Sequence, residues 1–582
     1  MRIVFRLSYL LFVLIFIFDN LGETFSISAS PLTPGSIIVL DKIHLMKGRH
    51  HSNRRDSTSH MAEKGDATAA NAPRGGATAA LSPKVEEEKY SPLVTLRRTI
   101  FPIYGRQEVI KFLLIGTIKF FIILALTLTR DTKDTLVVTQ CGAEAIAFLK
   151  IYGVLPAATA YIALYTKLSN VFDKQTLFYV TCIPFFIFFL IFDILIFPNA
   201  DVLHPSLSVM QKIFGASTGG LQVLAKICSN WTSALFYIVS EIYSSVSVGL
   251  LFWQFANDVV SIDQAKRFYP LFAQMSGLAP VVAGQYMVRY TSVAPDLGTS
   301  LHRLTAAVTA SGIMICTFYT FARRFLARTE PAIQGKSGKG TKKSKPKMSM
   351  VESAKFLASS EYLRLIASLV LGYGLSINFT EIIWKSLVKK QYPDPLEYQK
   401  FMGNFSSAVG ISTCLVIFVG VQLIRILGWR VGACATPTLM ALLAAPFFAC
   451  ILMGLENEPS RLRLAVILGT AQSLVSKTSK YALFDPTTQM AYIPLDDDSK
   501  VKGKAAIDVL GSRIGKSGGS FLQQGLVLYF GDILTAAPAV GLIFYTVLWK
   551  WFAAANRLGT LFQAAQVEQK SENDDQLDRK TK

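Results

Sequence analysis

Charged residues are scarce for a chain of this length. Of 582 residues, 17% are Asp, Glu, Lys or Arg, whereas a typical soluble domain carries about 25%. The apolar fraction is 51% and the mean hydropathy is +0.39, which a disordered chain does not reach. The apolar residues come in blocks of about 20, the length that one helix needs to cross a bilayer. The composition therefore argues against a soluble protein and predicts a polytopic membrane protein.

Cysteine and histidine are also few and scattered. The seven cysteines are widely spread with no CxxC pair, and most lie in apolar stretches. Four of the six histidines come before residue 61, and His204 and His302 are isolated. We therefore expect no disulfide framework, no zinc or other metal site and no cofactor. Because the acids and bases of a hydrolytic site do not cluster either, we interpret the protein as not an enzyme.

The N-terminal segment has the pattern of a targeting sequence. Arg2 and Arg6 precede a short apolar run, Leu7 to Phe18, typical of a signal peptide. The following stretch is rich in Ser, Thr, Ala, Arg and Pro and has no sustained period. We predict a signal peptide over residues 1–22 and a disordered or removed presequence over residues 23–100. An uncleaved anchor helix is the alternative for the apolar run.

Twelve apolar blocks predict about twelve membrane-spanning helices. They lie near residues 108–130, 145–166, 175–197, 232–253, 268–290, 303–323, 362–386, 404–426, 431–454, 463–484, 505–530 and 534–554. Residues 198–230 are polar enough to lie outside the bilayer. The predicted fold is an all-α polytopic membrane protein with two six-helix halves, at residues 101–323 and 356–556.

A basic segment connects the two predicted halves. The chain carries 59 Lys and Arg against 39 Asp and Glu, and residues 323–347 alone hold nine of these cations with one acid. By the positive-inside rule, this connecting loop, predicted over residues 324–355, faces the cytosol-like side. An even number of spans places the polar tail, residues 557–582, on the same side. Two such halves are the layout of major-facilitator transporters, which alternately open a central cavity; a fold alone does not establish function.

Charged residues inside predicted spans are functional candidates, since each costs about 2.5–3.5 kcal/mol near the bilayer centre. At the end of the first span, Arg130, Asp131, Lys133 and Asp134 are followed by apolar residues. This pattern indicates a continuing helix whose charges face a wet cavity. A self-paired cluster at the membrane interface is the alternative.

Two carboxylates lie in the fourth and seventh predicted spans. Glu241, in the fourth span, has about nine or more uncharged residues on either side, and Glu381 ends the seventh span. Glu381 mirrors Lys133 of the first half, as a lock across a cavity would require. The alternatives are a protonated carboxyl at Glu241 and a simple helical pair between Glu381 and Lys385.

The eleventh span contains a run, Gly511 to Gly519, that resembles a phosphate loop. Three residues separate its first glycine from the Gly-Lys pair, where a Walker A motif needs four, and no strand precedes it. We therefore interpret the run as a helix that presents Arg513 and Lys516 to the cavity. Lys477 and Lys480 add two cations in the tenth span.

The cations outnumber the acids in these spans, which favours a polyanionic substrate such as a triphosphate. A nucleobase could stack on one of several aromatic residues, although ordinary packing is the alternative for each. These aromatic residues are Tyr237, Trp253, Phe268, Tyr269 and Tyr373.

Several motifs resemble one transporter family. They are Arg130–Thr139, Asn230–Thr232 leading to Glu241, Leu251–Asn257, Ala265–Phe272, Tyr481–Thr487, Met490–Asp496 and Lys502–Asp508. The sequence over residues 100–560 resembles the ATP/ADP carriers of plastids and of obligate intracellular bacteria, and closely resembles the broad-specificity nucleotide transporters of diatom plastids.

The resemblance implies nucleotide transport by alternating access, commonly as counter-exchange, with critical charges at Lys133, Glu241, Glu381 and Lys516. We expect Lys133 and Lys516, supported by Arg513 and Lys480, to bind the phosphates. The predicted coupling and gating residues are Glu241, Glu381, Asp134 and Lys385. Proton-coupled import and strictly ATP/ADP-specific exchange are the alternatives.

One stretch departs from the adenylate-specific pattern of the family. After Tyr-Pro-Leu-Phe, this chain has Ala273 to Gly277 in place of Gly-Leu-Gly-Ala-Asn. We therefore expect a broader range of nucleoside and deoxynucleoside triphosphates and diphosphates. The candidates for the base pocket are Asn257, Gln274, Ser276, Gly277 and Tyr373.

The resemblance also bears on location and partners. A signal peptide followed by a hydroxyl-rich segment is similar to the presequences of algae with complex plastids. We expect a monomer in the inner envelope of such a plastid, with nucleotides and the lipid bilayer as partners and no nucleic acid.

Overall fold

The computed structural model describes residues 103, 105–215, 219–329, 350–454, 458–496, 499, 502–504, 506–507 and 516–581. All of them belong to one compact unit, Pro102–Lys582. No strand occurs among the described residues. The predicted signal peptide and presequence lie outside them.

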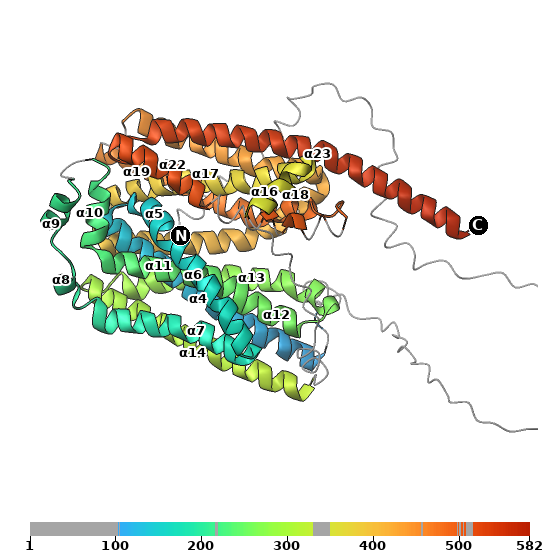
Figure 1. The fold of residues 1–582 in the computed structure, drawn as a ribbon, viewed down its shortest axis with the longest axis horizontal. Coiled ribbons are helices and arrows are strands. Elements are labelled where there is room, and N and C mark those ends of the chain that lie inside the picture. Colours follow the sequence, from blue (N-terminus) through green and yellow to red (C-terminus); the bar gives the residue numbers. More distant parts are fainter. Residues whose placement is uncertain are drawn as a thin grey trace, which may run out of the picture. The chain divides into compact units, whose positions relative to one another are not determined.

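In the described part of the first half, six helical rods follow the predicted spans (Figure 1). Four of the rods contain a π-helical turn, labelled η. The rods are α4 (Arg106–Cys141); α5 (Ala145–Phe148), η1 (Leu149–Val154) and α6 (Leu155–Val171); α7 (Lys174–Ile191) with η2 (Phe192–Ile196); α11 (Trp231–Val246), η3 (Ser247–Phe252) and α12 (Trp253–Val259); α13 (Ile262–Tyr286) with η4 (Met287–Thr291); and α14 (Leu297–Thr329).

Three short helices connect the third and fourth rods, in the region predicted to lie outside the bilayer. They are α8 (Ala200–Leu203), α9 (Leu207–Ile213) and α10 (Gln222–Ser229). We call the end of the bundle that carries α8, α9 and α10 the cap end (Figure 1). The opposite end, where α4 starts and α14 finishes, is the loop end.

The second half repeats the plan. Its helices are α16 (Met350–Ser359), α17 (Glu361–Gln391), α18 (Pro395–Leu452), α19 (Pro459–Ser479), η6 (Lys480–Phe484), α20 (Asp485–Met490), α22 (Lys516–Phe530) and α23 (Ala537–Thr581). The long α18 is two rods, because Gly428 breaks it with φ 83° and ψ 169°, a conformation that favours glycine. The break lies between the predicted spans 404–426 and 431–454. The all-α fold with about twelve spans in two halves is confirmed.

Eight of the described helices are long and apolar enough to cross a membrane. The first of them, α4, continues to Cys141, eleven residues beyond the predicted end of the span at residue 130. The helix tolerates its polar stretch because hydroxyls such as those of Thr132 and Thr135 donate to carbonyls one turn earlier, at 2.7 and 2.8 Å. The expectation that the helix continues through the charges is confirmed.

Two predicted boundaries differ from the structure. Helix covers part of the predicted connecting loop at both ends, since α14 continues to Thr329 and α16 begins at Met350; residues 330–349 lie outside the description. The predicted polar tail is helical to Thr581. After Gly559 it contains neither Gly nor Pro and is rich in Gln, Glu, Lys and Ala, which favour helix.

The two halves meet in a contact between α13 and α18 that is made by glycines. A methyl group added at Gly284 would overlap the carbonyl oxygen of Gly403, and one added at Gly410 would lie 2.6 Å from the carbonyl oxygen of Gly277. The glycines of each helix are seven residues apart, which is two helical turns. Small residues at such a spacing let two helix backbones approach closely.

This contact predicts the effect of adding side-chain volume. Replacing Gly284 by Val should destabilise the protein by about 1–3 kcal/mol, because the new side chain has no room. The matched control is Gly525→Val on α22, where an added Cβ meets nothing within 4 Å. Thermal unfolding in detergent should occur at a lower temperature for Gly284→Val only; equal unfolding temperatures would contradict the close packing.

Candidate functional site

Six charged side chains form a continuous chain of ion pairs that runs through both halves of the bundle. Positive and negative members alternate along it. We call this set the ion-pair chain; in order, its members are Glu241, Lys133, Asp134, Lys385, Glu381 and Lys477.

In the first half, the chain joins α11 to α4. Lys133 Nζ lies 2.9 Å from Glu241 Oε1 and 3.1 Å from Asp134 Oδ1. The same ammonium lies 4.0 Å from the ring centroid of Tyr237, one turn before Glu241 on α11. A carboxylate, a second carboxylate and an aromatic face therefore surround the Lys133 cation, which stabilises its charge away from water.

In the second half, the arrangement repeats with the signs exchanged. Glu381 on α17 accepts from Lys477 of α19 at 3.0 Å and lies 3.4 Å from Lys385, one turn along its own helix. Lys477 Nζ also lies 5.2 Å from the ring centroid of Phe405 on α18. The first half thus pairs a lysine on α4 with a glutamate on α11. The second half pairs a glutamate on α17 with a lysine on α19.

One ion pair of the chain crosses between the halves. Lys385 Nζ of α17 lies 2.8 Å from Asp134 Oδ2 of α4. The side chains of Lys133, Asp134 and Lys385 are at most 5% exposed, whereas Glu241, Glu381 and Lys477 are 20 or 21% exposed. The crossing is therefore sealed from solvent while both flanks of the chain remain accessible.

A second polar contact between the halves lies one turn from the first. Asp131 of α4 accepts from Ser406 Oγ of α18 at 2.5 Å and from Arg130 Nε at 3.2 Å. Asp131 is buried, and the Arg130 side chain is 37% exposed. The Arg130–Asp131 pair and the Lys133–Asp134 pair of α4 thus each contact a residue of the second half. The charged cluster at the end of the first predicted span is therefore not paired only with itself.

Sequence reasoning missed one lysine at this junction and understated another. Lys150 of η1 donates to Asn378 Oδ1 of α17 at 2.7 Å, again across the halves. The available signal was a lysine inside the predicted span 145–166. It was overlooked because it lies near the start of that span. Lys477 was noted as a buried cation without an assigned role, and the structure places it in the ion-pair chain.

Lys480 lies apart from the ion-pair chain, on the η6 turn. Its Nζ pairs with Asp485 at 3.1 Å and lies 4.8 Å from the ring of Tyr481 and 5.9 Å from that of Tyr373. Tyr373 is buried and stacks on Phe484 at 4.9 Å. The structure therefore brings the predicted phosphate ligand Lys480 together with the predicted base-pocket residue Tyr373.

The other predicted phosphate ligands are only partly described. Helix α22 begins at Lys516, but the side chain of Lys516 lies outside the described part, as does the whole of Arg513. Their predicted roles stay predictions.

The remaining base-pocket candidates are not brought together. Asn257 accepts a hydrogen bond from Tyr269 at 2.6 Å and lies 16 residues after Glu241 on one continuous rod, about 24 Å away along its axis. Gly277 packs against Cys414 of α18, whose thiol lies 3.7 Å from the carbonyl oxygen of Gln274. The side chain of Ser276 lies outside the description.

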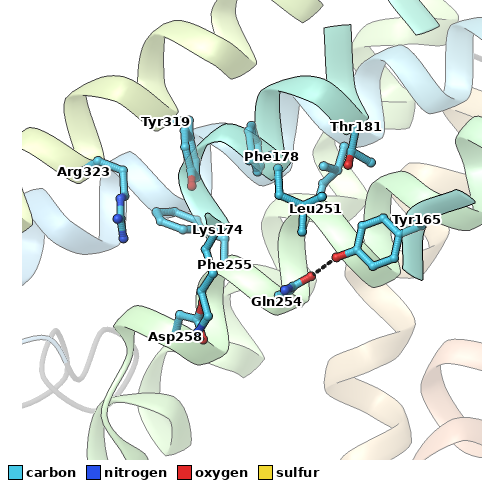
Figure 2. Close-up of a pocket in the computed structure, with 11 residues that line it drawn as sticks. Tyr165, Lys174, Phe178, Thr181, Leu251, Gln254, Phe255, Asp258, Tyr319 and Arg323 are labelled. Carbon is cyan, nitrogen blue, oxygen red and sulfur yellow. Dashed lines mark hydrogen bonds and ion pairs between the residues drawn. The ribbon is translucent and has the colours of Figure 1, made fainter. Parts of the chain in front are cut away.

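A cavity elsewhere in the first half has a different character. It lies near the loop end, between α6, α7, η3–α12 and α14 (Figure 2). Its Lys174 pairs with Asp258 at 2.8 Å, and Tyr165 donates to Gln254 at 2.6 Å. All its lining residues come from the first half, so a ligand bound there would not contact both halves.

The described residues contain no group of three or more His, Cys, Asp or Glu that could hold a metal ion. The junction itself presents lysines, carboxylates and aromatic faces. Such an arrangement can exchange one anionic oxygen for another at a lysine.

Comparison with known proteins identifies the family. The model of the TLC ATP/ADP transporter family matches residues 86–562. The chain belongs to this family. This membership confirms the resemblance noted in the sequence, and it confirms that the protein is a transporter and not an enzyme.

Curated relatives cover most of the transporter. "ADP,ATP carrier protein 1" of Chlamydia trachomatis is 40% identical over 503 residues, which cover 83% of this chain and 94% of that protein. "ADP,ATP carrier protein 1, chloroplastic" of Arabidopsis thaliana is 39% identical over 480 residues, covering 80% and 76%. Among solved structures, the nucleoside transporter NupG matches with a TM-score of 0.44 and 13% identity, covering 78% of this chain and 98% of that one.

The crossing pair of the ion-pair chain predicts a coupled effect on the transporter's stability. Lys385→Met should cost about 3 kcal/mol, because it leaves buried carboxylates with fewer cations. Removing both partners in Asp134→Asn/Lys385→Met should cost less than the sum of the two single changes. Lys167→Met, at an exposed lysine of α6, is the control. Thermal unfolding in detergent tests this, and strictly additive effects would contradict direct pairing.

Proposed function

We propose that this protein exchanges nucleotides across the envelope of a plastid by alternating access. Its substrates are nucleoside triphosphates and diphosphates, ATP and ADP among them. The observation that carries the proposal is the ion-pair chain, whose lysines come from both halves of the bundle. Membership of an ATP/ADP transporter family and relatives named as ADP,ATP carriers support it.

The phosphate groups act by competing with the carboxylates of the chain. Without substrate, Glu241 holds Lys133 and Glu381 holds Lys477. Glu241, Glu381 and Lys477 are the partly exposed members of these pairs, so incoming phosphate oxygens can displace the two carboxylates and form charge-assisted hydrogen bonds with the lysines. A nucleotide bound in this way contacts lysines of both halves. The Asp134–Lys385 pair is then no longer the one ion pair of the ion-pair chain that joins the two halves, because the nucleotide also joins them.

Exchange follows from the free-energy cost of breaking the ion-pair chain when no substrate is bound. Separating buried, paired charges costs several kcal/mol if nothing replaces the partner. A ligand shifts a conformational equilibrium only through its different affinities for the two states. The empty transporter therefore stays on one side, and each reorientation carries a nucleotide.

The base of the nucleotide fits at the Tyr373 end of the site. Tyr373 and Glu381 are eight residues apart on α17, which is about 12 Å along the helix. A nucleotide can bridge such a distance with its base near Tyr373 and its phosphates near the ion-pair chain. In this orientation, Lys480 serves the nucleoside end, and Lys133 and Lys516 bind the phosphates together with Lys477.

The departure of Ala273 to Gly277 from the adenylate-specific pattern supports a broad substrate range that includes deoxynucleotides. Of this stretch, Gln274 and Gly277 contact Cys414 of α18, at the contact between the halves. Relatives named chloroplastic support a plastid location. We place the protein in the inner envelope of a complex plastid, delivered by a signal peptide and a transit segment, and working as a monomer.

Proteoliposomes distinguish exchange from proton coupling. Vesicles preloaded with unlabelled ADP should take up labelled ATP, whereas empty vesicles should take up little. An uncoupler should leave this exchange unchanged, because no proton gradient drives it. Collapse of uptake with the uncoupler would instead establish proton-coupled import. Unlabelled ribo- and deoxynucleotides should both compete, and competition by ATP and ADP alone would establish strict ATP/ADP specificity.

Substitution of Lys516 tests the phosphate site. Lys516→Ala should abolish exchange in the same vesicles, because a cation of the second half is lost. Lys167→Ala on the surface of α6 serves as the control and should exchange normally. Uptake by Lys516→Ala near the unsubstituted level would remove this residue from the site.

A further inference from the structure

Lys150 differs from the lysines of the ion-pair chain because its hydrogen-bond partner in the other half is an amide. Its Nζ donates to Asn378 Oδ1 at 2.7 Å. Asn378 is itself held in place. Its side-chain nitrogen donates to the Gly374 carbonyl at 2.8 Å, and its main-chain carbonyl accepts from the Gln523 side chain at 3.0 Å. Lys150 lies on the π-helical turn η1, a feature that often occurs at functional sites.

The charges at the junction do not balance once Lys150 is included. Among the described residues, the ion-pair chain contains three carboxylates and three lysines, and Lys150 adds a fourth cation. Lys150 lies within electrostatic range of Glu241 and Glu381, but each of these carboxylates already holds a lysine of the chain. An amide oxygen carries no charge, so an anionic oxygen would stabilise the Lys150 ammonium more strongly.

The position of Asn378 on α17 locates this cation along the proposed site. Asn378 lies five residues after Tyr373 and three residues before Glu381, about 7.5 and 4.5 Å along the helix. When a nucleotide has its base at Tyr373 and its terminal phosphate at the ion-pair chain, the phosphates nearest the ribose lie beside Lys150. ADP and ATP have these phosphates in common.

We infer that Lys150 is a further phosphate ligand, which exchanges the amide of Asn378 for the ribose-proximal phosphates of the nucleotide. This inference rests on the proposed function and names the part of the substrate that the residue contacts. Because the Lys150–Asn378 contact joins the halves, the same exchange of partners also releases a polar contact between η1 and α17.

Equilibrium binding of ADP and ATP to the purified full-length protein in detergent tests the inference. Lys150→Gln removes the charge but keeps a hydrogen-bond donor at this position. It should raise the Kd of ADP and of ATP at least tenfold and by similar factors, whereas Lys150→Arg should bind nearly as tightly as the unsubstituted protein. Lys167→Gln, an exposed position on α6, is the matched control and should leave both constants unchanged.

A second variant keeps the test decisive if Lys150→Gln folds poorly. Asn378→Asp is nearly isosteric and gives Lys150 a carboxylate partner, so it should also weaken binding of both nucleotides. Unchanged Kd values in the folded variants would overturn the inference, and so would weakening confined to ATP, which would place Lys150 at the terminal phosphate. Failure of the unsubstituted protein to bind or exchange any nucleotide would overturn the proposed function instead.

Discussion

The need of each buried charge for a partner governs the junction between the two halves. Lys133, Asp134 and Lys385 are almost completely sealed from solvent, where an uncompensated charge would cost several kcal/mol. They are stable only because each touches a charge of opposite sign. Since Asp134 and Lys385 belong to different halves, the halves cannot separate at this level unless another group replaces the lost partner. Phosphate is a suitable replacement at a lysine, which connects the packing of the bundle to the transport of nucleotides.

The contacts between the halves are of two physical kinds. The glycine contact of α13 and α18 is closely packed, with the backbone of one helix against the backbone of the other. The ion-pair chain and the Lys150–Asn378 contact are polar and can change partners with the substrate. A transporter needs both kinds: surfaces that pack reproducibly and a polar junction whose stability depends on what is bound. The opposite signs at Lys133–Glu241 and Glu381–Lys477 allow the two halves to complement each other, which equal signs would not.

The sequence predicted the fold better than the site. Apolar blocks of about 20 residues determine how many helices can span a bilayer, so the spans were found, but hydropathy does not reveal where a helix ends. Helix α23, for example, continues through a polar tail, whereas the continuation of α4 past Arg130 was predicted from the apolar residues that follow its charges. Lys133, Glu241, Glu381 and Lys385 stand out in the sequence because a charge amid apolar residues is conspicuous, and the structure joins them in the ion-pair chain. Asn257 lies far along its rod from Glu241. Lys150 was missed because its role depends on a partner 228 residues away, which only the folded chain reveals.

The most direct measurement is a cryo-electron-microscopy structure of the protein with ADP bound. The account predicts phosphate oxygens within hydrogen-bond distance of Lys133 and Lys477, lysines of opposite halves, with Glu241 and Glu381 displaced from them. A nucleotide bound within one half, for example at Lys174 in the cavity between α6 and α14, with every pair of the ion-pair chain intact, would contradict it.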